Sequence, residues 1–321
     1  MKNKILITGG AGFIGSNLCE FYLGKGDEVV CLDNLSTGRM SNIEAFLGHS
    51  CFTFLEGDIR EIDTCRTAVK ACDYVLHQAA IGSVPRSIDD PIRTNDNNVN
   101  GFLNILVAAR DEGVKRIVYA ASSSTYGDSK QMPKVEEVIG NPLSPYAVSK
   151  YVNELYAHVF ALNYGMELIG LRYFNVFGKN QDPNGAYAAV IPKFINLMKV
   201  GIAPTVFGDG KQSRDFTHVS NVVLMNDLAV NSKNDLALNT VFNTACGENA
   251  SLLELFQIIK SKLSSLDATK KNLNLRFEKE RRGDVKHSMA SIEKAKKVFG
   301  YQPLTFLKEG VEELVEIEIS K

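Results

Sequence analysis

The sequence predicts an α/β fold, a doubly wound parallel sheet with a smaller C-terminal α/β region. Two observations carry this prediction. Short β-rich runs alternate with helical patterns over about the first 170 residues, the order that strand–helix–strand units produce. Several of the strands are apolar throughout, as expected for a parallel sheet covered by helices on both faces.

The elements of the first half follow from apolar runs and their periodicity. We expect strands at "KILIT" (4–8), "EVVCL" (28–32), "CFTFLEG" (51–57), "DYVLHQAA" (73–80), "RIVYAAS" (116–122) and "ELIGLRYF" (167–174). Helical patterns lie between them, at 13–24, 61–70, 95–112 and 145–164.

The composition changes after residue 174. The segment "GKNQDPNGAYAAVIPK" (178–193) is rich in Gly, Asn and Pro, which indicates a functional loop. Shorter elements follow, namely a helix near 188–199, a strand at "PTVF" (204–207), helices near 219–231 and 251–265, a strand at "NLRF" (274–277) and two terminal helices. We therefore expect a first domain over 1–174 and a second over 175–321. Some elements of the second segment are expected to pack in the first domain.

Bulk composition indicates an ordinary globular protein. The 321 residues are 45% hydrophobic and 23% charged, with a net charge of −1, so electrostatics gives no case for nucleic acid or an anionic membrane as partner. No apolar run reaches membrane-spanning length. The N-terminus "MKNKILITGG" leads directly into a strand, so we expect no signal peptide and a cytoplasmic location.

Cysteine and histidine spacing predicts no metal site. The six cysteines form no CxxC pair, and the five histidines form neither HxxxH nor HExxH. We interpret the cysteines as small buried side chains in a reducing compartment.

A glycine-rich turn follows the first predicted strand. In "TGGAGFIGSNL", Gly10, Gly12 and Gly15 fit GxGxxG, and Gly9, Gly12 and Gly15 also fit GxxGxxG. A strand precedes the turn, a helix follows it, and Asp33 ends the second strand eighteen residues after Gly15. This context is typical of a Rossmann cradle, in which a pyrophosphate approaches the helix N-terminus and the acid binds a ribose hydroxyl.

The residues around Asp33 bear on the choice of dinucleotide. A carboxylate would repel a 2′-phosphate, so Asp33 favours NAD over NADP, whereas the nearby Arg39 is the residue that would favour NADP. Asp58, in "GDIR", closes the third strand, where it could contact the adenine or serve only as a turn residue.

The pattern Tyr-x-x-Ser-Lys occurs twice, at 126–130 and 146–150. Tyrosine and lysine four residues apart share a face only within a helix. Gly127 and Asp128 predict a turn for the first copy, whereas Ser144 is a plausible N-cap and Pro145 a favourable first residue for a helix that contains the second. We therefore assign Tyr146 and Lys150 as the reactive pair.

Electrostatics makes such a pair a feasible general base. Lowering a tyrosine pKa from ~10 to ~7 requires about 4 kcal/mol of preferential phenolate stabilisation. A cation about 4 Å away supplies about that much at an effective dielectric of about 20. The first copy has a separate use, because Ser122, Ser123 and Ser124 end a strand at the edge where such sheets bind ligands.

Taken together, the motifs resemble the extended short-chain dehydrogenase/reductases that epimerise nucleotide sugars. The resemblance covers nearly the whole chain and includes "TGGAGFIG", "EGDIR", "HQAAIGSVPRS", "ASSSTYG", "SPYAVSK", "LRYFNVFG", "GDGKQSRDF" and "RRGD". "HQAAIGSVPRSI" and "FGKNQDPNGAYAAVIPKF" are most similar to the bacterial UDP-N-acetylglucosamine (UDP-N-acetylgalactosamine) 4-epimerase group.

The resemblance implies a tightly held NAD and a UDP-sugar substrate. The implied NAD contacts are Gly9, Gly12, Phe13, Ile14, Gly15, Asp33, Asn34, Ser36, Thr37, Gly38, Asp58, Ile59, Gln78, Ala79, Ala80, Asn97, Tyr146, Lys150 and Tyr173. The implied substrate contacts are Gly82, Ser83, Ser122, Ser123, Tyr146, Asn175, Ala189, Val190, Lys193, Thr205, Val206, Phe207, Arg214, Arg281, Asp284 and Ser288.

Two of these positions bear on the choice of sugar. In the family, a small residue at the position of Ser288 is associated with 2-acetamido sugars and a tyrosine with plain hexoses, and Gly82 leaves further room. The implied reaction is reversible 4-epimerisation through a 4-keto sugar. Tyr146 would be the general base, held as a phenolate by Lys150, and Ser122 and Ser124 would align the 4-hydroxyl of the sugar. No acidic pair follows the serine run, which argues against 4,6-dehydration.

The sequence is also compatible with other substrates and with one other class of function. The substrate could be a UDP-N-acetyl-hexosaminuronic acid or UDP-glucose/UDP-galactose, and a non-catalytic NAD-binding redox module is the alternative of another class. The family also implies a homodimer, in which helices equivalent to 95–112 and 145–164 form a four-helix bundle.

Overall fold

A seven-stranded parallel sheet forms the centre of the computed structural model, which describes residues 2–183, 189–279 and 287–320. Its order is β11-β6-β5-β4-β1-β2-β3, and every pairing is parallel. The predicted doubly wound fold is confirmed. The strands are β1 (Lys4–Thr8), β2 (Glu28–Asp33), β3 (Phe52–Glu56), β4 (Tyr74–His77), β5 (Arg116–Ser122), β6 (Leu168–Tyr173) and β11 (Thr240–Thr244).

The seventh strand, β11, was not among the predicted elements. It pairs with β6 and forms one edge of the sheet, although about 70 residues of chain separate the two strands. Its sequence "TVFNT" is only five residues long and three of the five are polar, so it gives a weak strand signal between the helices predicted near 219–231 and 251–265. Strand β4 ends at His77, three residues earlier than predicted, because the chain leaves the sheet there and lines a cavity.

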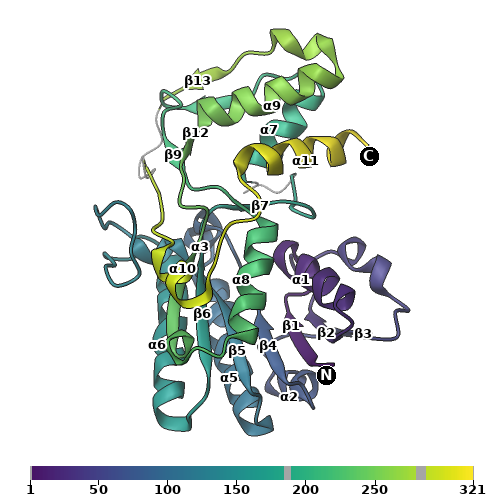
Figure 1. The fold of residues 1–321 in the computed structure, drawn as a ribbon, viewed down its shortest axis with the longest axis vertical. Helices are drawn as coiled ribbons and strands as arrows, with labels where there is room; N and C mark the ends of the chain where they lie inside the picture. The colour runs from purple at the N-terminus through teal and green to yellow at the C-terminus, as the bar shows by residue number, and fades with distance from the viewer. Residues whose placement is uncertain (1, 184–188, 280–286, 321) are drawn as a thin grey trace.

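Helices cover both faces of the sheet (Figure 1). One face packs against α1 (Phe13–Gly24), α8 (Val219–Asn231) and α10 (Glu293–Phe299). The other packs against α2 (Ile62–Val69), α5 (Gly101–Glu112) and α6 (Pro145–Tyr164). The short helices α3 (Val84–Asp89) and α4 (Pro91–Asn95), followed by a π turn over Asp96–Asn100, lead into α5.

A smaller layer lies above the carboxyl edge of the sheet, whereas the N-terminus lies at the opposite end (Figure 1). Helices α7 (Val190–Lys199), α9 (Leu252–Leu266) and α11 (Leu307–Ile319) share an apolar core of their own. Three strand pairs accompany them: β7 (Val176–Phe177) with β10 (Thr217–His218), β8 (Thr205–Phe207) with β13 (Arg276–Glu278), and β9 (Ser213–Arg214) with β12 (Ala250–Ser251).

The long helix α6 begins and ends as its sequence predicts. Ser144 is the N-cap, and its hydroxyl accepts a hydrogen bond from Ala147 N at 3.1 Å. Pro145 occupies the first turn, and Gly165 ends the helix in the left-handed region at φ 65°. The first Tyr-x-x-Ser-Lys copy is not helical, because a 3-10 turn over Ser123–Tyr126 stops at Gly127.

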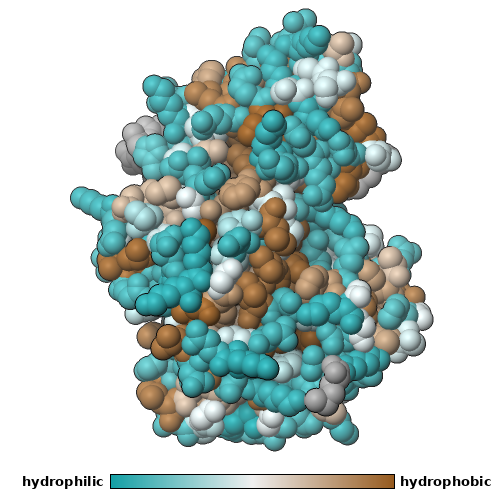
Figure 2. Space-filling view, viewed as in Figure 1, coloured by the Kyte–Doolittle hydropathy of each residue, from teal (hydrophilic) through white to brown (hydrophobic). Residues whose placement is uncertain are grey.

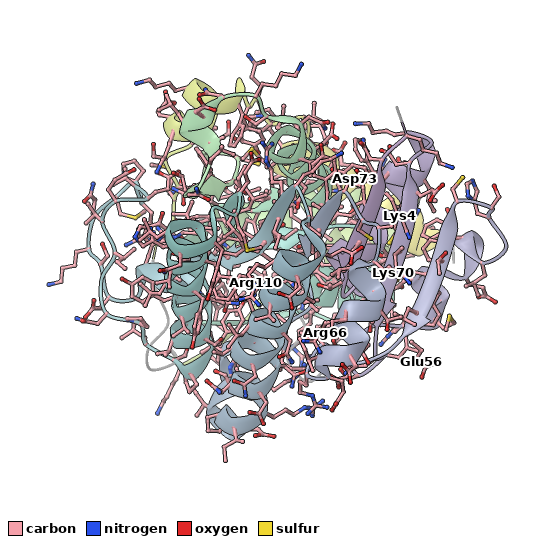
Figure 3. The ribbon with its side chains drawn as sticks, turned by 90° about the horizontal axis from the view of Figure 1, so that it is seen from below. Lys4, Glu56, Arg66, Lys70, Asp73 and Arg110 are labelled. Carbon is pink, nitrogen blue, oxygen red and sulfur yellow. The ribbon has the colours of Figure 1, made fainter. Side chains whose placement is uncertain are left out.

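The surface of the view in Figure 2 is mostly hydrophilic, with apolar side chains gathered near its middle and over the lower part of α6. Among the described residues, no helix combines the length and apolar character that a membrane span needs. Figure 3 shows the amino edge of the sheet, where Lys4, Lys70 and Asp73 lie. There Asp73 accepts the backbone N–H of Lys4 at 2.8 Å and ties β1 to the start of β4.

His77, at the end of β4, is buried without an acidic partner. Its Nδ1 lies 2.9 Å from Thr8 Oγ1, and its ring packs 5.2 Å from the ring of Phe102. Burial, with a smaller contribution from the charge of Lys150, lowers the pKa of His77 to about 3. An unfolded histidine titrates near 6.5, so the folded chain binds fewer protons than the unfolded chain between these values.

We therefore expect His77 to destabilise the fold as the pH falls from 6.5 toward 3. Between pH 7.5 and 5.5 this residue should remove about 1.4 kcal/mol of unfolding free energy. His77→Asn, which can still bond Thr8 Oγ1, should abolish that part of the pH dependence in urea denaturation. The same substitution at the exposed His49, outside the proposed dimer interface, is the control and should keep the wild-type slope. An unchanged slope in His77→Asn would contradict this assignment.

Candidate active site

The turn between β1 and α1 forms a narrow cradle. Gly9 has a φ of 67°, and a Cβ on Gly15 would lie 2.1 Å from the carbonyl oxygen of Gly9. Gly12 is the N-cap of α1 and offers no side chain to its free backbone N–H groups, and the first turn holds no acid. These N–H groups and the helix dipole suit a phosphate, so the residues present fit a dinucleotide.

Asp33 is held beside this cradle. Its carboxylate accepts hydrogen bonds from Ala11 N at 3.0 Å and Leu35 N at 2.8 Å. Burial raises the pKa of Asp33, and these N–H groups oppose the rise. Arg39 extends to Asp182, with its Nη2 2.6 Å from Oδ2, so its charge is paired with an acid. This pairing supports the preference for NAD that Asp33 indicates.

Tyr146 and Lys150 lie one turn apart at the start of α6. Lys150 is buried, and its Nζ donates a hydrogen bond to the carbonyl oxygen of Ala120 at 2.8 Å. Burial lowers the pKa of Lys150 to about 8. Both side chains line the same cavity as the glycine cradle. Helix α6 therefore places the predicted tyrosine and lysine together at one site.

The pKa of Tyr146 differs from the expectation. Burial raises it above the ordinary value, and the side chain of Ser122 only opposes that rise. The ammonium of Lys150 is engaged with Ala120 O. The protein alone therefore does not bring the phenol toward neutrality, because desolvation of the phenolate exceeds the stabilisation that its neighbours provide.

The serine run at the end of β5 divides into two groups. Ser122 and Ser123 line the cavity beside Tyr146. Ser124 does not, because its hydroxyl donates to Ser122 Oγ at 2.9 Å and its N–H contacts the same oxygen at 3.1 Å. Ser124 thus contacts Ser122 and does not line the cavity, so any part that it plays in aligning the hydroxyl would act through Ser122.

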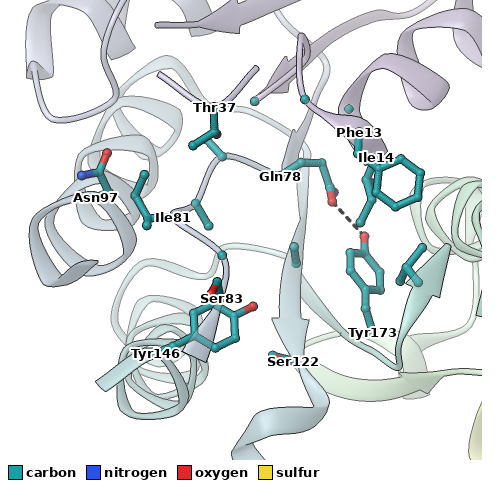
Figure 4. A pocket seen from close by; sticks show the side chains of 18 of the residues that line it. Phe13, Ile14, Thr37, Gln78, Ile81, Ser83, Asn97, Ser122, Tyr146 and Tyr173 are labelled. Carbon is teal, nitrogen blue, oxygen red and sulfur yellow. Dashed lines mark hydrogen bonds between the residues drawn. The ribbon is translucent and has the colours of Figure 1, made fainter. Parts of the chain in front are cut away.

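The first cavity has a volume of about 600 Å³ and contains most of the predicted cofactor site (Figure 4). Its lining includes Gly9, Gly12, Phe13, Ile14, Gly15, Asp33, Asn34, Ser36, Thr37, Ile59, Gln78, Ala79, Ala80, Asn97, Tyr146, Lys150 and Tyr173. The predicted sugar contacts Gly82, Ser83, Ser122 and Ser123 line the same cavity.

A ring of three polar side chains fixes one wall of this cavity. The Tyr173 hydroxyl donates to Gln78 Oε1 at 3.0 Å, the contact drawn as a dashed line in Figure 4. Asn226 Nδ2 donates to the same hydroxyl at 2.9 Å, and Gln78 Nε2 donates to Asn226 Oδ1 at 3.3 Å. No sequence motif marks Asn226, which comes from α8, far along the chain from Gln78.

A second cavity, of about 370 Å³, adjoins the first, since Asn175, Val176 and Ala189 line both. It lies among α7, β8 and β9 and is lined by the predicted Asn175, Ala189, Val190, Lys193, Thr205, Val206, Phe207 and Arg214. Two cations beside aromatic side chains suit a diphosphate joined to a flat base.

Three predicted contacts are displaced from the cavities. Gly38 lies behind Asp33, and a Cβ there would be 2.8 Å from both carboxylate oxygens. Asp58 is held by Arg60, whose guanidinium lowers its pKa to about 2, and it accepts a hydrogen bond from Asn34 Nδ2 at 2.8 Å. Ser288 donates its N–H to Ser213 O at 3.1 Å and lines neither cavity. Arg281 and Asp284 lie outside the described residues.

Several lining residues were not predicted. They are Leu32, Gly57, Ile81, Arg86, Ala120, Ala121, Val176, Gln181 and Asp182 in the first cavity, and Phe177, Ile191, Phe194, Gln212, Phe216 and Leu252 in the second. Gln181 is notable because its Oε1 is buried without a hydrogen-bond partner. It belongs to the loop that composition marked as functional, so a signal was present.

Residues 5–245 match the sequence model of the NAD dependent epimerase/dehydratase family. The chain is 34% identical over 315 residues to the UDP-glucose 4-epimerase of Mycolicibacterium smegmatis, covering 98% of this chain and 97% of the relative.

Solved structures agree over the full length. The UDP-N-acetylglucosamine 4-epimerase of Methanobrevibacter ruminantium M1, in complex with UDP-N-acetylmuramic acid, is 38% identical with a TM-score of 0.92, covering 100% of this chain and 99% of that one. The UDP-glucuronic acid 4-epimerase of Bacillus cereus, in complex with UDP-glucuronic acid and NAD, is 30% identical with a TM-score of 0.87, covering 98% and 99%.

The cradle geometry gives a direct test of cofactor binding. Gly15→Ala should lower the NAD(H) released on denaturation at least about tenfold, because the new Cβ must displace the backbone that contacts the pyrophosphate. Gly24→Ala is the matched control in the same helix, since a Cβ there meets nothing within 4 Å. The control should retain its NAD and gain up to ~1 kcal/mol of stability. Equal NAD content in both variants would contradict the assignment of the glycine-rich turn as the pyrophosphate-binding site.

Proposed function

This chain belongs to the NAD-dependent epimerase/dehydratase family, and we propose that it interconverts UDP-N-acetylglucosamine and UDP-N-acetylgalactosamine by inverting C4 of the sugar. It is an NAD-dependent isomerase. The observation that carries the proposal is the arrangement of Tyr146, Lys150 and Ser122 in the cavity that the glycine cradle lines, continuous with a second cavity that holds Lys193 and Arg214. We also propose that 1–174 mainly binds NAD and 175–321 mainly binds the UDP-sugar.

Each residue has a distinct task in this reaction. The residues that line the first cavity would hold NAD, which would supply the hydride acceptor and donor for C4 and a positive charge beside the phenol. Tyr146 Oη takes the proton of the 4-hydroxyl and later returns it to the same oxygen. Ser122 aligns that hydroxyl, and Lys150, fixed by Ala120 O, stabilises the phenolate. Lys193 and Arg214 hold the diphosphate while the 4-keto sugar turns to present its other face.

The space around the sugar supports a 2-acetamido substrate. A Cβ added to Gly82 would meet nothing within 4 Å, so the cavity has free volume beside it. Ser288 lines neither cavity, so only the family association of a small residue at its position, and not its place in the structure, favours a 2-acetamido sugar. Sequence identity does not choose between the sugars, since the chain is 38% identical both to a UDP-N-acetylglucosamine 4-epimerase and to a relative described as a putative UDP-glucose 4-epimerase. UDP-glucose and the uronic acids are the alternatives, since relatives at 34% and 30% identity act on them.

The substrate can be identified without added cofactor. Purified protein should form a second isomer from UDP-N-acetylglucosamine with a higher kcat/KM than from UDP-glucose, UDP-glucuronic acid or a UDP-N-acetyl-hexosaminuronic acid, as separated by ion-pair chromatography. Tyr146→Phe should lower kcat at least about 10²-fold because the proton acceptor is lost, while UDP binding stays intact.

The second tyrosine of the repeated pattern is the matched control. Tyr126 is buried, and its hydroxyl donates to Asn243 Oδ1 at 2.6 Å, outside both cavities. Tyr126→Phe should cost about 1 kcal/mol of stability and leave kcat within about threefold. Full turnover by Tyr146→Phe, or preferential turnover of UDP-glucose, would overturn the corresponding part of the proposal.

We further propose a homodimer through α5 and α6. Val148, Leu155, Val159 and Leu162 are exposed on α6 at spacings of seven, four and three, which places them on one face. Burial of this stripe against its copy would form a helix bundle. Light scattering should give twice 35.3 kDa for the protein, and Leu155→Lys should give the monomer mass. A monomeric wild type would contradict this interface.

A further inference from the structure

Asp215, between β9 and β10, has a fully buried carboxylate that the proposed mechanism does not use. Its Oδ1 accepts the N–H of Cys246 at 2.9 Å, and its Oδ2 accepts the N–H groups of Gly247 at 3.0 Å and Ala290 at 3.3 Å. Cys246 and Gly247 follow the end of β11, whereas Ala290 belongs to a segment some 40 residues later. One carboxylate therefore joins three separate parts of the chain.

These parts carry the residues assigned to the UDP-sugar. Arg214, which lines the second cavity, precedes Asp215 directly. The backbone oxygen of Asp215 accepts a hydrogen bond from Asn175 Nδ2 at 3.0 Å, and Asn175 lines both cavities. Ser288 stands two residues before Ala290 and donates its N–H to Ser213 O at 3.1 Å. Asp215 thus stands next to the arginine, bonds the asparagine through its backbone oxygen, and holds the segment that carries the serine through its carboxylate.

The environment of Asp215 is unfavourable for a negative charge. Burial raises its pKa to about 6, the backbone N–H groups oppose this rise, and the nearby charge of Glu248 adds to it. Backbone N–H groups thus provide the principal stabilisation of the ion. A buried acid stabilised in this way constrains geometry, because each N–H must point at the oxygens for the charge to be tolerated.

We propose that Asp215 is a positioning residue that holds Arg214, Asn175 and the Ser288 segment in the arrangement that binds the UDP-sugar. The proposal rests on the function proposed above. Asp215 lines neither cavity, so it acts through these neighbours and does not touch the ligand. Its loss should weaken the binding of UDP and leave the cofactor site, which is built on β1, β4 and β5, as it was.

Asp215→Asn keeps the size of the side chain and replaces one acceptor oxygen with a donor that faces an N–H group. It should raise the Kd of UDP, measured calorimetrically, and the KM of the UDP-sugar about tenfold or more, with kcat within about threefold. The NAD content should equal that of the wild type. A UDP Kd within about twofold of the wild type, or a fall in kcat with unchanged KM, would overturn the proposal.

Asp73→Asn is the matched control. This aspartate also accepts a backbone N–H that joins two segments, but it lies at the amino edge of the sheet, away from both cavities (Figure 3). It should lower stability without changing the UDP Kd. If both variants weaken UDP binding equally, the effect is general destabilisation and Asp215 has no positioning role.

Wild-type protein provides a second measurement that holds even where Asp215→Asn fails to fold. Added UDP should slow hydrogen exchange at the amides of Cys246, Gly247 and Ala290, since ligand binding at Arg214 and Asn175 tightens the junction. Unchanged exchange under saturating UDP would overturn the proposal. Wild-type protein that binds UDP but turns over no UDP-sugar would refute the proposed function alone, because these binding and exchange tests remain valid.

Discussion

The hydrogen bond from Lys150 Nζ to the carbonyl oxygen of Ala120 fixes helix α6 against the end of strand β5, and the geometry of the site depends on it. Ser122 stands two residues after Ala120, and Tyr146 stands one turn before Lys150. The contact therefore sets the phenol beside the serine hydroxyl. Two asparagine contacts support it, since Asn98 Nδ2 donates to Ser149 Oγ at 3.0 Å and Asn153 Nδ2 donates to Asn98 O at 2.9 Å.

Holding a lysine in this position costs stability, because burial makes its ammonium less favourable. The fold offsets such costs by fixing α6 elsewhere. Glu154, one further turn along the helix, forms a buried two-pronged ion pair with Arg172 of β6, with contacts of 2.9 and 2.7 Å. The guanidinium of Arg172 in turn lies 4.8 Å from the ring centre of Tyr126. Tyr126, from the first Tyr-x-x-Ser-Lys copy, thus contacts the arginine that anchors α6, the helix that contains the second copy.

Local signals in the sequence predicted six of the seven strands in the central sheet and the ends of α6, because these follow from apolar runs, an N-cap serine and a terminal glycine. Strand β11, the Asn226 contact and the carboxylate of Asp215 escaped prediction, since each depends on partners distant in sequence. Ser124 and Asp58 belong to the predicted motifs but contact residues that line the cavity, Ser122 and Asn34, and do not line it themselves; such a detail depends on side-chain contacts that the motif does not specify.

The proposed enzyme inverts C4 of the sugar within two adjoining cavities and retains its cofactor through each turnover. The most direct test is to incubate the purified protein with UDP-N-acetylglucosamine that carries deuterium at C4, without adding NAD. We predict that the UDP-N-acetylgalactosamine formed keeps the deuterium at C4, because hydrogen leaves and returns to that carbon inside the cavity. Loss of the label to solvent, or the absence of any isomer until NAD is supplied, would contradict the account.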